Sequence, residues 1–436
     1  MAIKRFAAAL PILRSLVAKS DPSLITYAEA LELIGLRVTP LPIERVPTQH
    51  AGGRILATDV FSPADLPNFD NSAMDGIALR CETEGLAAGS ELAIAGLLAA
   101  GDPAPSGGTD AWQIMTGAAL PPDCNAVLPI EQITVLARSS HGAITHVRLR
   151  ANARPDMNVR RAGTDIAKGE LALSAGVRID PAQKMICAAL GIAELPLCKR
   201  AQVSLLRTGK ELVDDPGQAL SMGQIRDCNG PYLESVLDGA GAEVIDSRHL
   251  GDDPRAYEEA LTQALAACAD VIVSTGAVSM GELDFIPATL RRLGAEIVFH
   301  KLGIRPGKPV LFAVLPGGAL YFGLPGNPLA AAVGARFVIE PALRAMSGRA
   351  AEKHPRLPLA HATRKKPGMR SFLKARVHIR SGGVADVELL PGQQSFRIRP
   401  LLSANAWAIL HEDSDSCEQA EMVEVAGLYG ALLEGC

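Results

Sequence analysis

Two glycine-bearing loops decide the fold of this chain: Ser274–Phe285 reads STGAVSMGELDF, and Gly323–Ala330 reads GLPGNPLA. Each follows an apolar, strand-like run, Asp270–Val273 (DVIV) before the first and Ala319–Phe322 (ALYF) before the second. In an open parallel sheet, the loops at the carboxyl ends of the strands line one crevice. Glycine lets the backbone approach a ligand closely, and bare amides attract anions. The two loops therefore predict a binding site for a phosphorylated small molecule.

Around these loops, residues 200–347 alternate strands with helices, which predicts a parallel sheet with helices on both faces. The expected strands are Val203–Leu206, Glu243–Ser247, Asp270–Val273, Glu296–Phe299 and Leu320–Phe322. The expected helices are Pro231–Asp238, Pro254–Ala267, Phe285–Leu293 and Pro328–Met346. The fold class is therefore multidomain α/β plus β, with a central parallel-sheet α/β domain.

The flanking segments predict smaller domains. Residues 21–36 favour a helix capped by Asp21 or Ser23. Short alternating strands between turns predict an inserted β domain, and the prolines and short strands near the C-terminus predict a β barrel or sheet. The expected parts are an arm at 1–20, a discontinuous linking domain at 21–60 and 162–199, an inserted β domain at 61–161, the α/β domain at 200–350 and a β-barrel domain at 351–436.

Composition narrows the class of protein. The 436 residues are 48% hydrophobic with a net charge of -4, an ordinary globular balance without the basic stripe of a nucleic-acid binder. Eight cysteines stand singly with no CxxC pair, which favours reduced thiols in a cytoplasmic protein. Pro11 and Arg14 interrupt the apolar run near the N-terminus, so we interpret it as an amphipathic arm. No run approaches the length that spans a bilayer, so no membrane partner is expected.

Three loops after expected strands carry the polar groups of the candidate site: Arg207–Leu212 (RTGKEL), Ser274–Asp284 and Leu324–Asn327. Glu211 and Asp284 supply carboxylates to the first two. In the third, Pro328 pre-sets the first helical residue, so we expect the amides beyond it to be free to hold phosphate. One such glycine is more often an ordinary turn, but three loops on one sheet edge favour a site. Their turn residues are Thr208, Gly209, Thr275, Gly276, Pro325, Gly326 and Asn327.

A cationic loop precedes the third of these segments. Lys301–Val310 (KLGIRPGKPV) places Lys301, Arg305 and Lys308 among glycine and proline. Cations on a stiff loop suit an oxyanion or a phosphate. A solvated surface loop is the alternative, and the apolar residues that flank Gly307 favour a loop held in place.

A second dense motif lies far away at Pro67–Gly76 (PNFDNSAMDG). Its run of Asp70, Asn71, Ser72 and Asp75 is typical of a turn with Asx hydrogen bonds, and two close carboxylates could also hold a hard cation such as Mg²⁺. Ile114–Gly117 (IMTG) and Arg160–Asp165 (RRAGTD) add the hydroxyl of Thr116 and the carboxylate of Asp165.

Seven motifs in order resemble those of the molybdopterin molybdenumtransferase family: NFDNSAMDG, IMTGA, RRAGTDI, RTGKEL, STGAVSMGELD, KLGIRPGKP and GLPGNP. This family includes the bacterial molybdenum-cofactor enzyme and the C-terminal part of gephyrin, and the resemblance runs from about residue 21 to the end. It implies an elongated L-shaped subunit with a molybdopterin-binding α/β domain and a C-terminal β barrel. It also implies a homodimer that inserts molybdate into adenylylated molybdopterin, with Mg²⁺-dependent release of AMP.

The resemblance assigns roles motif by motif. The implied catalytic residues are Asp75, Thr116, Asp165, Glu211 and Asp284, and the implied Mg²⁺ ligands are Glu211, Asp252 and Asp284, although Asp253 next to Asp252 is the better helix cap. The implied substrate-binding residues are Ser72, Thr208, Gly209, Asp227, Asn229, Thr275, Gly276, Ser279, Lys301, Arg305, Lys308, Pro325, Gly326, Asn327, Arg370 and Ser395.

Three departures from the family pattern stand out: Arg305 for a common lysine, Ala277 for a common glycine and Ile77 for a common tyrosine. None removes a carboxylate. The reaction needs no nucleophilic side chain, and Cys228 has no histidine partner in sequence. Two other functions stay open: an adenylyltransferase that acts one step earlier, and a non-catalytic scaffold like gephyrin. That adenylyltransferase is also a candidate partner of this chain.

Overall fold

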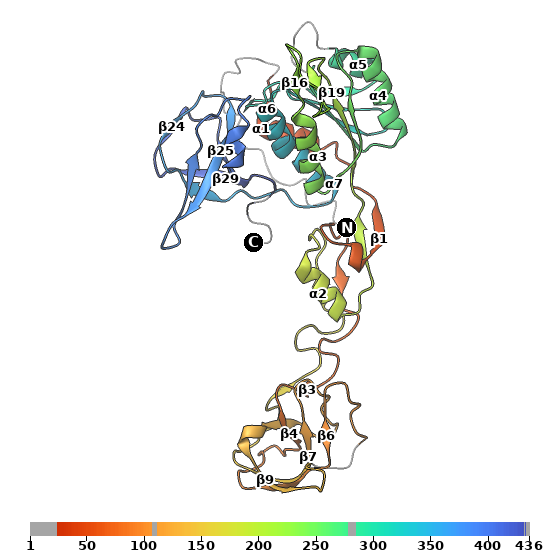
Figure 1. Ribbon diagram of the computed structural model, residues 1–436, viewed down its shortest axis with the longest axis vertical. Helices are drawn as coiled ribbons and strands as arrows, with labels where there is room; N and C mark the ends of the chain where they lie inside the picture. The colour runs from red at the N-terminus through yellow and green to blue at the C-terminus, as the bar shows by residue number, and fades with distance from the viewer. Residues whose placement is uncertain (1–23, 107–110, 278–284, 431, 433–436) are drawn as a thin grey trace. The chain divides into compact units, whose positions relative to one another are not determined.

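The computed structural model describes residues 24–106, 111–277, 285–430 and 432, and these divide into two compact units (Figure 1). One unit runs to Pro42 and resumes at Lys199, and the other spans Ile43–Cys198. The second unit is thus inserted into the first. No helix among the described residues has the length and apolar character needed to cross a membrane.

The first unit is built on a six-stranded sheet in the order β17-β14-β18-β22-β21-β19. The strands are β14 (Gln202–Arg207), β17 (Glu243–His249), β18 (Val271–Thr275), β19 (Glu296–Phe299), β21 (Leu311–Val314) and β22 (Leu320–Leu324). The four strands from β17 to β22 pair in parallel, whereas β21 pairs antiparallel with both β22 and β19. The expectation of a purely parallel sheet is wrong at this edge, because the turn between β21 and β22 is too short for a crossover helix.

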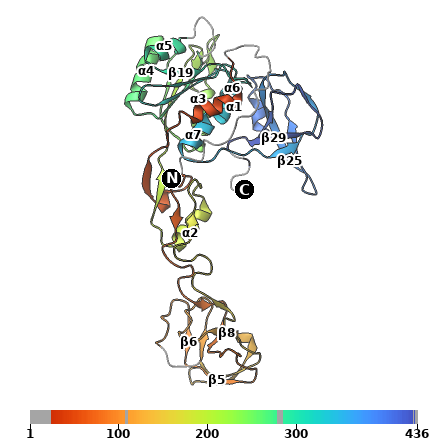
Figure 2. The ribbon, with the colours of Figure 1, turned by 180° about the vertical axis from the view of Figure 1, so that it is seen from behind.

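Helices cover both faces of this sheet, as the sequence predicts (Figures 1 and 2). They are α3 (Asn229–Gly239), α4 (Pro254–Ala266), α5 (Ile286–Arg292), α6 (Pro328–Gly334), the π-helical η3 (Ala335–Ile339) and α7 (Glu340–Met346). Side chains alternate along each strand, so Val271 and Val273 pack with α3 and α6 while Ile272 packs with α4 and α5. The expected helix Pro328–Met346 is present, with the π-helical turn inside it.

The N-terminal helix of the described chain is α1 (Tyr27–Gly35), shorter than the expected helix 21–36. Thr26, rather than Asp21 or Ser23, caps it, because Thr26 and Glu29 form a reciprocal capping box. Its apolar face, including Ala30 and Ile34, packs in the core of the first unit. This segment, which the sequence placed in the linking domain, therefore folds with the α/β sheet.

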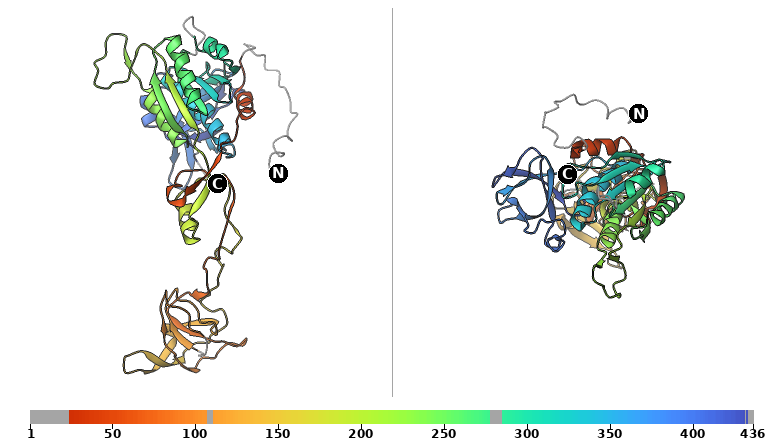
Figure 3. Two further views of the ribbon diagram at one scale, coloured as in Figure 1. Left: turned by 90° about the vertical axis from the view of Figure 1, so that its right-hand side faces the viewer. Right: turned by 90° about the horizontal axis from the view of Figure 1, so that it is seen from above.

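The C-terminal part of the first unit is a sheet in the order β20-β25-β27-β29-β23, in which β26 also pairs with β25. Its strands are β20 (Ile304–Arg305), β23 (Arg356–Pro358), β25 (Arg370–Ile379), β26 (Ala385–Leu389), β27 (Ala406–Leu410) and β29 (Met422–Gly427). A bridge between Leu359 and Val387 links the end of β23 back to β26. Through β20, the cationic loop of the α/β sequence is tied to this sheet. Figure 3 shows the C-terminal strands of this sheet in blue.

The second unit contains strand pairs that join its two chain ends. β1 (Ile43–Pro47) pairs with β13 (Glu194–Cys198), and β2 (Val60–Phe61) pairs with β12 (Leu171–Leu173). α2 (Pro181–Ala189) contributes Cys187 to their small core. Segments before and after the expected β insertion therefore pair with each other.

The rest of the second unit holds short sheets around cores of their own, and their strands pair antiparallel except for the parallel pair of β6 and β7. The strands are β3 (Asn71–Ser72), β4 (Gly76–Leu79), β5 (Glu91–Ala93), β6 (Leu97–Leu98), β7 (Ala111–Ile114), β8 (Ala126–Pro129), β9 (Ile133–Arg138), β10 (Ile144–Leu149) and β11 (Val159–Arg160). β3 and β4 carry the PNFDNSAMDG motif, and they pair with β11 and β7. This pairing brings three separate motifs together.

Candidate active site

The ends of β14, β18 and β22 meet through backbone contacts at the carboxyl edge of the sheet. The Thr208 amide and hydroxyl both donate to the Thr275 carbonyl, at 2.9 and 3.0 Å, and the Gly276 amide donates to the Leu324 carbonyl at 3.1 Å. Gly276 has φ of 84°, and a Cβ there would lie 2.5 Å from the Thr208 carbonyl oxygen. Glycine is therefore required at position 276 for the loops to approach each other this closely.

Ala277 shows the consequence of a departure from the family pattern. Its φ is 48°, so the left-handed conformation persists although alanine stands where the family commonly has glycine. The loop thus holds an alanine in a conformation that favours glycine, at an energetic cost. Ser279 and Asp284, further along the same loop, lie outside the described residues.

A buried ion pair that the sequence did not single out supports the neighbouring loop. Arg207 donates to the Asp227 carboxylate at 2.5 Å, and the Asp227 side chain is 3% exposed. The other Asp227 oxygen accepts the amides of Asn229 and Gly230, and the Asn229 side chain donates to the Gly326 carbonyl at 2.8 Å. The predicted residues Asp227, Asn229 and Gly326 are therefore brought together, with Arg207 beneath them.

Gly230 is the residue that makes room for this pair. A Cβ there would lie 2.7 Å from Arg207 Cδ and 2.8 Å from an Asp227 carboxylate oxygen. The Arg207 Nε is buried and has no hydrogen-bond partner among the described residues. In the sequence, Gly230 directly follows Asp227-Cys228-Asn229. This glycine is the one local signal that the backbone comes close to the Arg207–Asp227 pair.

Two exposed carboxylates lie on adjoining loops at this edge. The Glu211 carboxylate lies over Gly209, within 2.7–2.9 Å of where a Cβ of that glycine would be. The Asp252 carboxylate accepts the Lys210 amide at 3.3 Å, while Asp253 caps α4 by accepting the Arg255 amide. Among the described residues, no group of three or more acidic, histidine or cysteine side chains is placed to hold a metal ion.

The N-terminal amides of α6 are already bonded, which corrects the expectation that they are free. The amides of Ala330 and Ala331 donate to the Asn327 carbonyl, and the Leu329 amide donates to the Ser395 carbonyl at 3.0 Å. Ser395 thus meets the GLPGNP segment through its backbone. A phosphate site at this terminus would have to displace these bonds.

The cationic loop is held in place, as its apolar flanks predict. Ile304 and Arg305 pair with β25, and the Lys301 carbonyl accepts the Ile25 amide. Gly307 has φ of 111°, and a Cβ there would lie 3.1 Å from Ile304 and 3.7 Å from the Ala330 carbonyl of α6. The side chains of Arg305 and Lys308 remain exposed.

Arg370, from the C-terminal sheet, is engaged by neighbouring side chains. Its guanidinium donates to Glu412 at 2.8 Å and lies 5.1 Å from the centre of the Tyr27 ring. Although burial by itself raises the pKa of Glu412, the hydrogen bond from Arg370 prevails and leaves that pKa lowered. The backbone of Arg370 donates to the Gly303 carbonyl, next to the cationic loop.

In the second unit, Asp75 and Thr116 form a pair across two motifs. One Asp75 carboxylate oxygen accepts both the amide and the hydroxyl of Thr116, each at 2.7 Å. The bond from the Thr116 amide, and then that from its hydroxyl, lowers the pKa of the exposed Asp75 carboxyl. Ser72 is fully buried, and its hydroxyl donates to the Met74 carbonyl, so this side chain shapes the turn.

Asp70 connects the same turn to the RRAGTD motif. Its carboxylate accepts the Ala162 amide at 2.8 Å and pairs with Arg161, and these contacts, led by the amide, lower its pKa. The amide of the exposed Asp165 donates to the Leu66 carbonyl at 3.0 Å. The structure therefore places Asp75, Thr116 and Asp165 on neighbouring segments of one unit.

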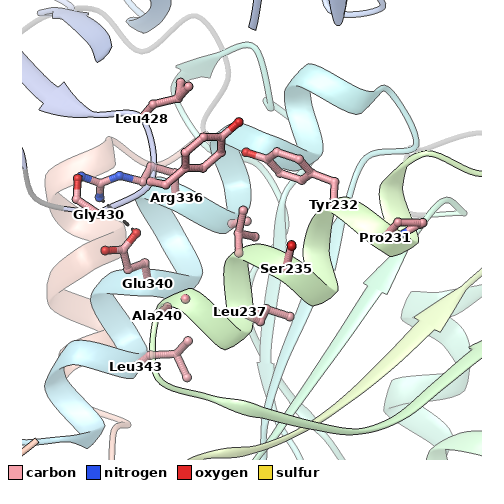
Figure 4. Close-up of a pocket in the computed structure, with 14 residues that line it drawn as sticks. Pro231, Tyr232, Ser235, Leu237, Ala240, Arg336, Glu340, Leu343, Leu428 and Gly430 are labelled. Carbon is pink, nitrogen blue, oxygen red and sulfur yellow. Dashed lines mark hydrogen bonds and ion pairs between the residues drawn. The ribbon is translucent and has the colours of Figure 1, made fainter. Parts of the chain in front are cut away.

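A pocket of about 470 Å³ lies elsewhere, between α3, η3, α7 and the Leu428–Gly430 segment (Figure 4). The Arg336 guanidinium at this pocket forms ion pairs with the carboxylates of Glu340 and Glu352, at 3.3 and 2.7 Å. None of the described candidate site residues lines it. We therefore separate this pocket from the candidate site.

Cys228 lies directly after Asp227, at the start of α3. Burial and the neighbouring Asp227 charge raise the pKa of its thiol, which leaves little thiolate at neutral pH.

Comparison with known proteins covers nearly the whole chain. Residues 25–191 match the MoeA N-terminal region (domain I and II), residues 204–345 match a probable molybdopterin binding domain, and residues 356–428 match the MoeA C-terminal region (domain IV). A molybdopterin molybdenumtransferase of Synechococcus elongatus is 35% identical over 93% of this chain and 100% of its own length. The chain belongs to the molybdopterin molybdenumtransferase family. The resemblance inferred from the seven motifs is thereby confirmed.

Further relatives agree with this assignment. The molybdopterin molybdenumtransferase of Haemophilus influenzae is 35% identical over 88% of this chain and 94% of its own length. Among solved structures, a molybdopterin biosynthesis MoeA protein from Pyrococcus horikosii matches with a TM-score of 0.77 and 28% identity, over 93% of this chain and 100% of its own. The multidomain architecture is therefore that of the molybdenumtransferase family.

Proposed function

We propose that this chain inserts molybdate into adenylylated molybdopterin and releases AMP. The observation that supports it best is the meeting of the Thr208, Gly276 and Gly326 loops at the carboxyl edge of β14, β18 and β22. Ligands of open α/β sheets bind at this edge. Membership of the molybdenumtransferase family supplies the substrate class.

We propose that carboxylates of this edge hold a magnesium ion together with the substrate. Mg²⁺ prefers oxygen ligands and is commonly held by one or two carboxylates together with water and substrate phosphates. Glu211 and Asp252 are exposed carboxylates on adjoining loops, so they would provide the protein ligands, with Asp284 as the third predicted one. When bound, Mg²⁺ would offset the phosphate charge that develops as AMP leaves.

The cationic loop would hold the oxyanion substrate. Arg305 and Lys308 are exposed on a loop that β25 and α6 hold in position, so their charges are available at a defined place. Fixed cations bind an oxyanion without having to be ordered first, which favours molybdate at this loop. Lys301 and Arg370 complete this proposed cluster.

The Asp75–Thr116 pair would act on the reacting groups themselves. Its carboxylate is exposed and ionised, and the two bonds from Thr116 fix its direction. Membership of the family supports a homodimer, in which Asp75 would act together with the α/β loops. The L-shaped subunit, a closed C-terminal barrel and an adenylyltransferase partner are proposed on the same ground, and the Leu359–Val387 bridge also favours the barrel.

One experiment separates this function from its alternatives. The purified chain is incubated with adenylylated molybdopterin, molybdate and Mg²⁺, and AMP release and metal insertion are both measured. We expect both in equal amounts, and neither without Mg²⁺. In a parallel incubation with molybdopterin, ATP and Mg²⁺, formation of adenylylated molybdopterin would indicate an adenylyltransferase instead. No turnover in either incubation would indicate a scaffold.

A further inference from the structure

A fully buried lysine, Lys374, lies on β25 of the C-terminal sheet. The Lys374 ammonium donates to the carbonyls of Gly392 and Arg397, at 2.7 and 2.9 Å. These carbonyls belong to the two ends of one loop, so a single side chain closes it. Burial of a charged amine is costly unless its bonds are made, and it is the kind of feature that requires an explanation.

Gln393 reinforces the same closure. Its side chain accepts the Lys374 amide at 3.0 Å and donates to the carbonyls of Lys374 and Leu390, both at 2.8 Å. Gly392 has φ of 78°, and a Cβ there would lie 3.2 Å from Arg397, so the turn is tight. The loop 390–397 is therefore fixed to β25 by two side chains, Lys374 from the strand and Gln393 from the loop.

The held loop reaches the candidate site. Ser395 lies inside it, and the Ser395 carbonyl accepts the Leu329 amide of α6 at 3.0 Å. α6 begins directly after Gly326 and Asn327, and the cationic loop lies against it at Gly307. The Lys374 ammonium thus bonds to Gly392 and Arg397, which are not candidate site residues. It is linked to the start of α6 indirectly, through the loop that it closes and the Ser395 carbonyl in that loop.

We propose that Lys374 and Gln393 are positioning residues for the substrate site, acting by holding the loop 390–397 against the N-terminus of α6. This inference rests on the proposed site at the α/β loops. An apolar side chain of the same length would satisfy the packing of β25, so packing alone does not explain an amine at this position. Burial, with a contribution from the Arg397 charge, lowers the pKa of Lys374 to about 8.

Lys374→Met is the direct test, with Arg376→Met as the matched control on an exposed position of the same strand. We expect hydrogen exchange of the Leu329 amide, measured on peptides covering Asn327–Val333, to accelerate in Lys374→Met and not in the control. Exchange in α4 should stay unchanged in both. The KM for molybdate should rise roughly tenfold with kcat nearly unchanged, because the site is loosened and its chemical groups are kept.

The Gln393→Leu variant covers the case in which Lys374→Met does not fold, and it should change exchange and KM in the same direction. A folded variant of either residue with parental exchange at Leu329 and parental KM would overturn the proposal. Arg305→Ala is measured in the same assay. If Arg305→Ala raises the KM while the Lys374 and Gln393 variants do not, the positioning role fails and the proposed site stands. If none of the variants has an effect, the proposed site itself fails.

Discussion

The two regions that carry the family motifs are built in different ways. At the α/β edge, the backbone shapes most of the candidate site: Thr208 and Gly276 bond to strand-end carbonyls, and the Gly326 carbonyl accepts the Asn229 side chain. In the inserted unit, side chains make the site: Asp75 meets Thr116 because β4 and β7 pair. The first region is sensitive to backbone changes and the second to single functional groups.

The largest effect should come from a backbone change at the α/β edge. Gly276→Ala would force a Cβ to within 2.5 Å of the Thr208 carbonyl at a φ of 84°, so we expect a loss of about 2–4 kcal/mol in the free energy of unfolding, with turnover abolished. Gly241→Ala is the control, because its φ of 90° carries the same strain with no atom within 4 Å. Denaturant unfolding measures both.

The neighbouring position should respond in the opposite direction. Ala277→Gly relieves a left-handed conformation in a residue that has a Cβ, which we expect to stabilise the fold by up to about 1 kcal/mol.

The Gly276 prediction has its own contradicting outcome. If Gly276→Ala is tolerated as well as Gly241→Ala, the close approach of the loops is not needed.

In the inserted unit, the two carboxylates of the PNFDNSAMDG motif should separate activity from stability. Asp75→Asn should lower turnover on the order of a hundredfold with only a small loss of stability, since this side chain is exposed and Asn keeps an oxygen that can accept the Thr116 bonds. Asp70→Asn should cost about 1 kcal/mol of stability, through Arg161 and Ala162, with turnover close to the parent. Thermal unfolding followed by circular dichroism measures the stability of both variants, and AMP release measures their turnover. An Asp75→Asn protein with full turnover would contradict the catalytic role of Asp75.

The cationic loop gives a smaller effect that depends on charge geometry. Arg305→Ala should raise the molybdate concentration for half-maximal rate about ten- to a hundredfold, the value of one charge-assisted contact. Arg305→Lys should cost much less, because the charge is kept and the backbone pairing with β25 does not involve the side chain. Steady-state titrations with molybdate measure both, and parental behaviour of both variants would show a solvated surface loop.

The smallest effect is a shift in acid sensitivity at Asp75. Asp75 is ionised at every pH above the pKa that it has in the folded protein, and the Thr116 bonds lower that pKa. The activity that depends on the ionised carboxylate is therefore lost only when the pH falls through this lowered pKa. Thr116→Val removes the hydroxyl bond and keeps the amide bond, so the pKa should move part of the way back up. We therefore expect the acid limb of the pH–rate profile to shift to higher pH. An unshifted limb would show that the hydroxyl does not influence Asp75.

The sequence predicts those features of the structure that depend on a short stretch of neighbouring residues. The strands of the parallel part and the helices between them were predicted because each has its own periodic pattern and turn. β21 was missed although Pro316, Gly317 and Gly318 form a turn between two apolar runs, which is a hairpin signal. The Thr26–Glu29 capping box was equally present in the sequence and was passed over.

Other features of the site depend on contacts that no local pattern encodes. The Leu329 amide is bonded to Ser395, and the Lys374 ammonium closes the loop that contains Ser395. The Arg207–Asp227 pair likewise joins a strand end to a helix start. These partners are brought together by the tertiary fold, so the family motifs point to Ser395 and Asp227 but not to Leu329, Lys374 and Arg207, which contact or hold them.

The central claim is that the two regions divide the work, with the α/β loops holding molybdate and Asp75 acting on the reacting groups. Molybdate titrations of Arg305→Ala and Asp75→Asn, run side by side at saturating adenylylated molybdopterin and Mg²⁺, test it most directly. The account predicts that Arg305→Ala raises KM and recovers the parental kcat at high molybdate, whereas Asp75→Asn keeps the parental KM and loses kcat at every concentration. The same kinetic change in both variants, or a KM change confined to Asp75→Asn, would contradict it.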